Sequence, residues 1–162
     1  MTHVVQERIT VRAPAAAVYA AVSDVRRMGE WSPECVGATL DDDPGSSLTV
    51  GSTFRGHNRL GRWRSWTTRC TVTDADPGRR FGFDVRLAGA LVSSWRFDLT
   101  SAPDGAGTEV VQSWWDRRGP ARRRVSALTS GVRDRSRHNR DGMRRTLAAL
   151  RATVECAAPP HR

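Results

Sequence analysis

The sequence predicts an α+β fold in which an antiparallel sheet of about seven strands packs against one long C-terminal helix. Residues 121–156 carry apolar side chains at spacings of three, four and their multiples, the period of a helix with one buried face. The preceding runs alternate apolar and polar side chains with a period of two, which is typical of half-buried strands. A length of 162 residues suits one domain with a substantial core.

The N-terminal segment predicts one strand and two short helices. Residues 3–11 alternate loosely between polar and apolar side chains and form the expected first strand. Pro14 then suits the first turn of a helix over 15–22, because the first turn leaves its N–H groups unpaired and proline has none. Ser23 and Asp24 can cap a second short helix that follows directly.

The middle of the chain predicts six further strands. A stiff turn at 30–35 precedes them, since Pro33 holds the residue before it in an extended conformation. Short turns separate most of the runs, which favours consecutive antiparallel pairing. The runs cover residues 36–40, 53–60, 63–74, 80–87, 91–101 and 108–115.

The C-terminal helix has a polar gap in its apolar face. The apolar positions are Val125, Leu128, Val132, Met143, Leu147, Leu150 and Val154. Between the third and fourth of these the face turns polar, at Ser136 and Asn139. A helix over all of 121–156 would be about 54 Å long. A compact domain of this size is roughly 40 Å wide, so we expect the helix to begin nearer Val125 or to protrude.

Strand alternation assigns one face of the sheet to the interior. We expect the inward set to be Phe54, Gly56, Asn58, Trp66, Thr68, Cys70, Val72, Phe81, Phe83, Val85, Trp95, Phe97, Leu99, Val110, Gln112 and Trp114. Three members, Asn58, Thr68 and Gln112, are polar, and buried polar groups need partners in the protein, in water or in a ligand. Polar groups facing a helix whose own apolar face is interrupted predict a pocket.

Composition limits the function classes. The net charge is +9, and all 26 basic residues are arginine, so no lysine is present to form a Schiff base. Three cysteines without a CxxC pair, and histidines without metal-ligand spacing, lead us to expect no disulfide framework, metal or cofactor. We find no signal region and no apolar run long enough to span a membrane, and therefore expect a cytoplasmic protein.

Several segments together resemble one superfamily. They are VRAPAAAVYAAVSDV (11–25), EWSPEC (30–35), PGRRFGF (77–83), GTEVVQSWWD (107–116) and GVRDRSRHNRDGMRRTLAAL (131–150). The chain resembles the START-like or SRPBCC superfamily, the polyketide cyclase/dehydrase and lipid-transport group. The resemblance implies a helix-grip fold, in which the antiparallel sheet curves around the long C-terminal helix, as a single domain over 1–156 with a flexible tail over 157–162. It also implies a deep cavity between sheet and C-terminal helix, with the second short helix and nearby loops at its mouth.

The residues that we expect to line this cavity combine aromatic walls with a few polar groups, as small-molecule sites do. They are Trp31, Phe54, Asn58, Trp66, Thr68, Cys70, Phe83, Trp95, Gln112, Trp114, Asn139 and Met143. Plain core packing is the alternative for the tryptophans. The Asn139 amide is expected either to hold a ligand carbonyl or hydroxyl, or to bond a strand side chain or a buried water.

Three functions fit these residues. The first is binding of an apolar or aromatic small molecule, lipid-like or polyketide-like. The second is polyketide aromatase/cyclase or dehydratase activity in the same cavity, and here the residues leave catalysis open. Aromatase/cyclases of this fold, as the resemblance implies, present a tryptophan, a hydroxyl residue and an arginine inward on one strand. This chain has Trp66 and Thr68 but Cys70 at the third position, while Arg69 alternates outward unless a one-residue bulge reverses it.

The third function is interaction through an arginine-rich surface. Twelve arginines lie between Arg117 and Arg151. They could bind an acidic carrier protein, nucleic acid or anionic lipid, or simply form a solvated face. Without interleaved aromatic residues or an RNA-binding signature, we expect no specific nucleic acid. The carrier-binding candidates are Arg117, Arg118, Arg122, Arg123 and Arg124.

Overall fold

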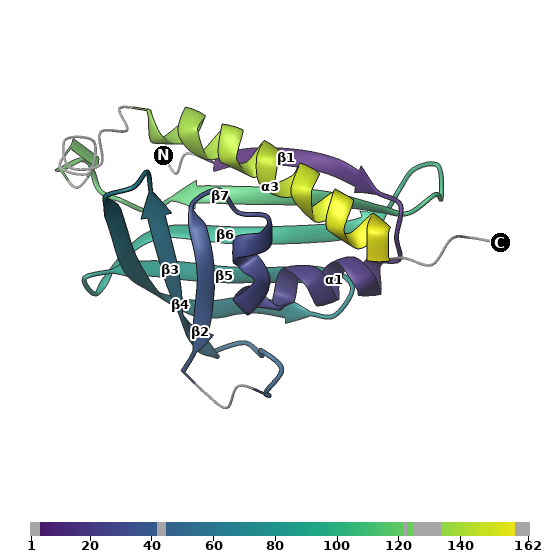
Figure 1. Ribbon diagram of the computed structural model, residues 1–162, viewed down its shortest axis with the longest axis horizontal. Helices are drawn as coiled ribbons and strands as arrows, with labels where there is room; N and C mark the ends of the chain where they lie inside the picture. Colours follow the sequence, from purple (N-terminus) through teal and green to yellow (C-terminus); the bar gives the residue numbers. More distant parts are fainter. Residues whose placement is uncertain (1–3, 42–44, 122, 125–133, 158–162) are drawn as a thin grey trace.

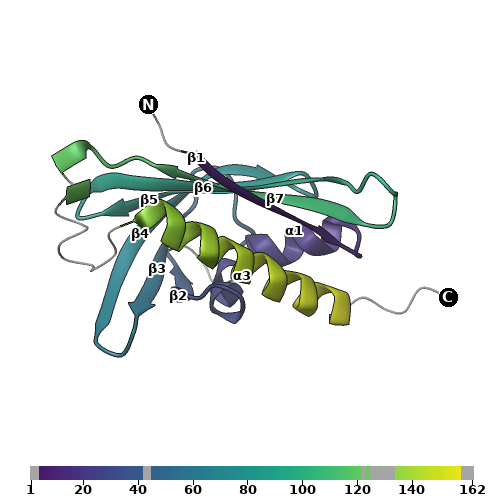
Figure 2. The ribbon, with the colours of Figure 1, turned by 90° about the horizontal axis from the view of Figure 1, so that it is seen from above.

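The structure is a computed structural model that describes residues 4–41, 45–121, 123–124 and 134–157. Its strands form one antiparallel sheet in the order β1-β7-β6-β5-β4-β3-β2, and its helices lie on one side of that sheet (Figures 1 and 2). The strands are β1 Val4–Val11, β2 Cys35–Leu40, β3 Thr53–Leu60, β4 Arg64–Asp76, β5 Arg80–Leu87, β6 Ala90–Ser101 and β7 Thr108–Asp116. The helices are α1 Ala15–Ser23, the 3-10 helix η1 Val25–Glu30, and α3 Arg135–Ala157.

This arrangement confirms the predicted α+β helix-grip fold. Strands β2 to β7 pair consecutively, as short turns require, and β1 adds to the far edge beside β7. The sheet curves strongly, so that β3 and β4 bend away from the plane of the other strands (Figure 2). Breaks in register occur between Val72 and Asp74 and between Val85 and Arg86, and such bulges increase local twist and bend. The curvature opens a space between the sheet and α3.

Two details of the predicted helices differ from the structure. The second short helix is a 3-10 helix, and the Asp24 carboxylate accepts a hydrogen bond from Arg26 Nε at 2.7 Å instead of capping it. Helix α3 begins at Arg135, later than expected, because the Asp134 carboxylate caps it by accepting from the Arg137 N–H at 2.9 Å. The predicted apolar positions Val125, Leu128 and Val132 lie outside the described residues.

The hydrophobic core fills the space between the sheet and the two α-helices. The remaining apolar positions predicted on α3, from Met143 to Val154, are all buried against it. The inward set of the sheet is also placed as predicted, since each member is buried or half-buried. Cross-strand pairs such as Phe54 with Cys70 and Gly56 with Thr68 put these side chains next to each other. The first half of α3 lies over the part of this face that is hollow.

Candidate functional site

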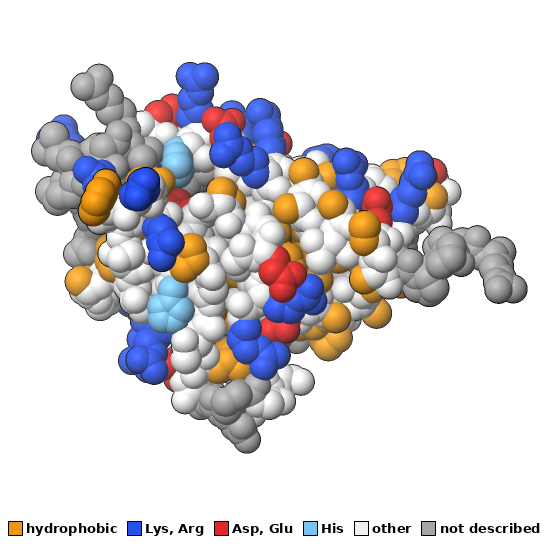
Figure 3. All heavy atoms as spheres, in the orientation of Figure 1, with side chains coloured by type: hydrophobic (Ala, Val, Ile, Leu, Met, Phe, Trp, Pro, Cys, Tyr) orange, Lys and Arg blue, Asp and Glu red, His pale blue; other side chains and the backbone are white. Residues whose placement is uncertain are grey.

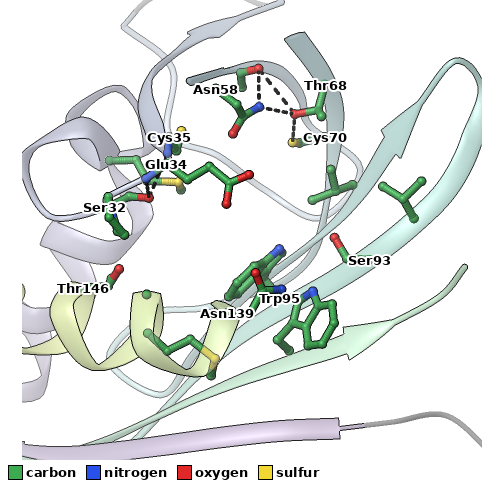
Figure 4. Close-up of a pocket in the computed structure, with 18 of the residues that line it drawn as sticks. Ser32, Glu34, Cys35, Asn58, Thr68, Cys70, Ser93, Trp95, Asn139 and Thr146 are labelled. Atoms are coloured by element: carbon green, nitrogen blue, oxygen red, sulfur yellow. Dashed lines mark hydrogen bonds between the residues drawn. The ribbon is translucent and has the colours of Figure 1, made fainter. Parts of the chain in front are cut away.

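A cavity of about 420 Å³ lies between the curved sheet, the turn before β2 and the first half of α3 (Figure 4). All twelve residues predicted to face a ligand line it. Further lining residues that the sequence reasoning did not select include Ser32, Glu34, Cys35, Arg64, Ser93, Arg118, Arg135, His138 and Thr146. The structure therefore brings the predicted set together in one place, and whether this set binds a ligand stays a prediction.

Aromatic side chains form much of the cavity wall. Trp95 and Trp114 lie 6.2 Å apart between ring centroids at a tilt of 46°, and Phe54 and Phe83 meet edge to face at 5.4 Å. Trp114 is also packed against Met143 of α3. These tryptophans therefore fit both interpretations, core packing and cavity lining, because they belong to the core and expose part of their surface to the cavity.

One polar group on the wall is satisfied within the protein. The Asn58 amide N–H donates to Thr68 Oγ1 and to the Gly56 carbonyl oxygen, both at 3.2 Å, and Cys70 Sγ lies 3.8 Å from Thr68 Oγ1 (Figure 4). A Cβ at Gly56 would come within 3.0 Å of the Thr68 hydroxyl, so glycine leaves room for this contact. Burial raises the pKa of the Cys70 thiol to about 12, which keeps it protonated and a poor nucleophile at neutral pH.

Two other amide side chains are not satisfied in this way by the residues that the structure describes. Gln112 is only 4% exposed, and its Oε1 is buried without any hydrogen-bond donor among the described residues. Asn139, 5% exposed on the inward face of α3, makes no side-chain hydrogen bond within the described part of the chain. Figure 4 shows Asn139 on α3, across the cavity from Asn58 and Thr68. An uncompensated buried polar group costs on the order of 1–3 kcal/mol, so these amides are suited to bonding something that enters.

A charged group at the mouth was not foreseen from the sequence. Glu34 Oε1 accepts a hydrogen bond from Arg135 Nη2 at 2.7 Å, and its Oε2 lies 3.4 Å from His138 Nε2. The Glu34 carboxylate extends into the cavity (Figure 4). Its two partners lie three residues apart on α3 and therefore on one face of it. Nothing in the local pattern of residues 30–35 signals this contact, because it joins segments about a hundred residues apart.

Of two arginines on β4, Arg64 lies on the cavity side of the strand and Arg69 lies on the outer side. Arg69 is exposed on the outer face, 3.7 Å from Asp41, and stands opposite Arg55 and Arg86 on the neighbouring strands. The irregularity in β4 begins after Val72 and does not reverse it. Arg64 has the same parity as Trp66 and lines the cavity. Strand alternation is therefore the signal in the sequence that identifies it.

The remaining titratable residues offer little additional chemistry. The pKa of the half-buried Cys35 thiol is raised by burial, which disfavours its thiolate. His57 lies 2.8 Å from the Thr39 hydroxyl on the outer side of the sheet. Among the described residues no cluster of three or more His, Cys, Asp or Glu side chains is arranged to hold a metal. No helix in that part of the chain is long and apolar enough to cross a membrane.

A curved sheet that grips a helix over an aromatic, partly polar cavity defines the helix-grip class of proteins. Within that class the chain belongs to the family described as polyketide cyclase / dehydrase and lipid transport, whose model matches residues 2–155. No protein with a curated function matches the sequence.

Solved structures agree with this assignment. A Polyketide_cyc-like protein from Corynebacterium glutamicum is 29% identical, with a TM-score of 0.61 and coverage of 100% of this chain and 99% of that one. A protein from Deinococcus radiodurans is 17% identical, with a TM-score of 0.69 and coverage of 96% and 100%. An AHSA1-like protein from Aeromonas hydrophila is 18% identical, with a TM-score of 0.66 and coverage of 99% and 98%. The last two likenesses concern the fold.

Proposed function

We propose that the protein binds an apolar or aromatic small molecule in the cavity between the sheet and α3. The observation that carries this proposal is a pair of amide side chains, Gln112 through its Oε1 and Asn139, that find no hydrogen-bond partner in the described part of the chain, within walls that are otherwise largely aromatic and aliphatic. Core packing alone gives no reason to bury a carbonyl oxygen without a donor. A ligand with a carbonyl or hydroxyl group can bond the Asn139 amide, and a ligand hydroxyl removes the cost at Gln112 Oε1 once that side chain turns toward the cavity that it lines.

The cavity sets the size of the ligand. At the roughly 30 Å³ that a water molecule occupies in the liquid, a volume of about 420 Å³ holds on the order of 14 non-hydrogen atoms. This corresponds to a molecule of two or three fused rings, or to a short acyl chain. Trp95 and Trp114 supply the flat apolar surface, and the polar groups fix the orientation.

Substitution of Asn139 tests the binding role. We expect Asn139→Leu to weaken the binding of a ligand recovered from the native protein by about 1–3 kcal/mol, because the ligand's polar group then loses its partner. Native mass spectrometry identifies the ligand, and calorimetry measures the affinity. Arg145→Leu, which changes an exposed residue of the same helix, is the matched control and should bind normally. Unchanged affinity in Asn139→Leu rules out the anchoring role, and the absence of any ligand in the cavity rules out the proposal.

Catalysis on a poly-β-ketone is a second candidate, favoured by the family description and by the Glu34 carboxylate directed into the cavity. Glu34 can accept or return a proton and the Asn139 N–H can stabilise an enolate oxygen, which are the groups that cyclisation of such a chain needs. Cys70, where aromatase/cyclases of this fold have an inward arginine, argues against aromatase chemistry. Product profiling with a poly-β-ketone synthase tests the activity, and identical products with and without the protein would exclude it.

Binding of an acidic carrier protein through the arginine-rich surface is the third candidate function. The described residues reduce the number of arginines that are available for it. Arg118 and Arg123 both contact the buried Asp116 carboxylate, at 2.9 and 3.2 Å, and are therefore partly neutralised. Arg122 lies outside the described residues. Arg117 and Arg124 remain exposed and are the residues to substitute in a carrier-binding assay. Binding that ignores salt would contradict an electrostatic contact.

A further inference from the structure

The tip of the β3–β4 hairpin, residues 59–64, carries an unusual surface. Trp63 is 90% exposed, and it is the only aromatic side chain in the described part of the chain that faces solvent so fully. The hairpin itself stands clear of the rest of the molecule (Figure 2). An aromatic side chain of this size normally buries most of its area. Its exposure at the end of a projecting hairpin leaves a large aromatic surface available to a partner outside the chain.

Three arginines surround this tryptophan. Arg59, Arg62 and Arg64 are all exposed, and none of them forms an ion pair within the described residues. Elsewhere on the sheet, exposed arginines such as Arg55 and Arg80 contact aspartates at 3.0 and 2.7 Å. The hairpin tip is thus a local excess of positive charge, and Figure 3 shows basic and hydrophobic side chains together at this end of the molecule.

The same tip borders the cavity. Leu60 and Arg64 belong both to the hairpin and to the cavity lining. Leu87, at the neighbouring β5–β6 turn, is 41% exposed and also lines the cavity. The exposed surface of the hairpin is therefore continuous with the wall of the cavity through Leu60 and Arg64.

We propose that the β3–β4 tip docks on an anionic lipid membrane and places the cavity mouth against it. Tryptophan prefers the boundary between lipid headgroups and acyl chains, where its ring is buried and its N–H stays hydrated. Arginines next to it attract anionic headgroups, each contributing about a fivefold gain in affinity. The evidence for docking is Trp63 and the three arginines next to it. The further step, that docking lets an apolar ligand enter the cavity from the membrane, rests on the function proposed above.

The shape and composition of the tip favour a membrane over other anionic partners. A single tryptophan at a convex tip differs from the series of aromatic side chains on which successive nucleic-acid bases stack. A protein partner of standard size buries about 800 Å² on each side, more than a two-strand tip presents. A lipid surface needs no complementary shape, and it is the place where an apolar ligand is available.

Vesicle sedimentation of the full chain tests the docking. We expect binding to vesicles of phosphatidylcholine with phosphatidylserine, little binding to phosphatidylcholine alone, and weaker binding as salt rises. Trp63→Ser should lower vesicle affinity about tenfold or more, and Arg59→Gln with Arg62→Gln about 25-fold. The matched control is Arg8→Gln with Arg145→Gln, which removes the same charge from exposed positions on β1 and α3 that form no ion pairs in the described residues.

The outcomes separate docking from cavity binding. Equal losses in the hairpin and control variants would show that net charge alone attracts the protein, and would overturn the proposal, as would full binding by Trp63→Ser. Tighter binding of a single-stranded oligonucleotide through the same hairpin would assign the surface to nucleic acid instead. The hairpin variants leave Gln112 and Asn139 intact, so ligand affinity in vesicle-free solution should be unchanged. Vesicle binding without any cavity ligand would refute the proposed function and leave the docking standing.

Discussion

Gln112 illustrates how a single residue can trade stability for binding. Its side-chain carbonyl oxygen is buried without a donor among the described residues, although Gln112 itself is paired on both sides in the sheet, with Glu7 of β1 and with Phe97 of β6. The backbone of β7 is therefore satisfied, and the cost falls on one side-chain oxygen. Natural sequences retain such a cost mainly where function requires it.

Replacing Gln112 by leucine tests this trade. We expect Gln112→Leu to raise the free energy of unfolding of the ligand-free protein by about 1 kcal/mol, because a leucine of similar volume removes the unsatisfied oxygen. The same change should weaken ligand binding. Chemical denaturation measures the first effect and calorimetry the second. Gln6→Leu, which removes an amide that donates to Ser113 Oγ at 3.0 Å, is the comparison and should lower the free energy of unfolding. A loss of stability in Gln112→Leu would show that its amide also has a partner inside the protein.

The three thiols should differ in reactivity. Burial raises the pKa of Cys70 from 9.0 to about 12, and it raises the pKa of Cys35 as well, whereas Cys156 is exposed. Thiolate is the reactive form, so at about pH 8 iodoacetamide should modify Cys156 first and Cys70 only after unfolding. Because the folded pKa of Cys70 is raised, its contribution to stability is complete below about pH 9 and is lost as the pH rises toward 12. Mass spectrometry of the labelled peptides checks the order, and early labelling of Cys70 would contradict its burial.

At the scale of elements, the turn before β2 is fastened to α3 by charge. Glu34 and Arg135 meet at 2.7 Å with side chains only 18% and 24% exposed, and Gly142 lies against Pro33. The turn and the first two turns of α3 both line the cavity, so this contact joins two of its walls. Because both partners are largely shielded from water, the pair is less screened than a surface ion pair.

Glu34→Gln should loosen that contact. We expect a loss of about 1 kcal/mol in the free energy of unfolding, since a neutral amide keeps the shape but gives up the charge-assisted hydrogen bond. Hydrogen exchange should become faster over 135–142 while β5 and β6 remain protected. Glu30→Gln, which removes an exposed partner of Arg27, should change neither measurement. Equal exchange rates over 135–142 in Glu34→Gln and in the unmodified protein would mean that packing alone positions the turn.

These elements also mark how far sequence reasoning reaches. Period-two alternation placed Trp66, Thr68 and Cys70 on one face correctly, because a strand reverses its side chains at every residue. The start of α3 was placed too early, since an apolar repeat cannot show where a cap interrupts it, and Asp134 is that cap. Glu34 was missed because its partners on α3 approach it only after the sheet has curved. Alternation is local, whereas this contact depends on the whole fold.

At the scale of the whole molecule, the fold was the most predictable property. The order of elements and their short connections leave few ways to arrange one sheet and one long helix, and the family assignment over 2–155 agrees. The cavity followed from the same order, because a curved sheet cannot contact a straight helix along its whole length. The order of elements did not predict which polar groups of the cavity are hydrogen-bonded within the protein. Asn58 and Thr68 bond each other, whereas Gln112 Oε1 and the Asn139 side chain find no partner among the described residues, and that difference arises from distances between strands and helix.

The last prediction concerns the coupling of ligand and fold. The cavity separates α3 from β3 and β4, so a ligand that fills it adds contacts between elements that otherwise face empty space. Binding only to the folded state stabilises it by about 2.7 kcal/mol when the free ligand is at a hundred times its dissociation constant. We expect a corresponding rise in the unfolding midpoint, with slower hydrogen exchange in α3 and in the β3–β4 hairpin together. In Asn139→Leu both effects should shrink in proportion to the lost affinity. Protection confined to the outer face of the sheet would place the ligand elsewhere and contradict the cavity as the binding site.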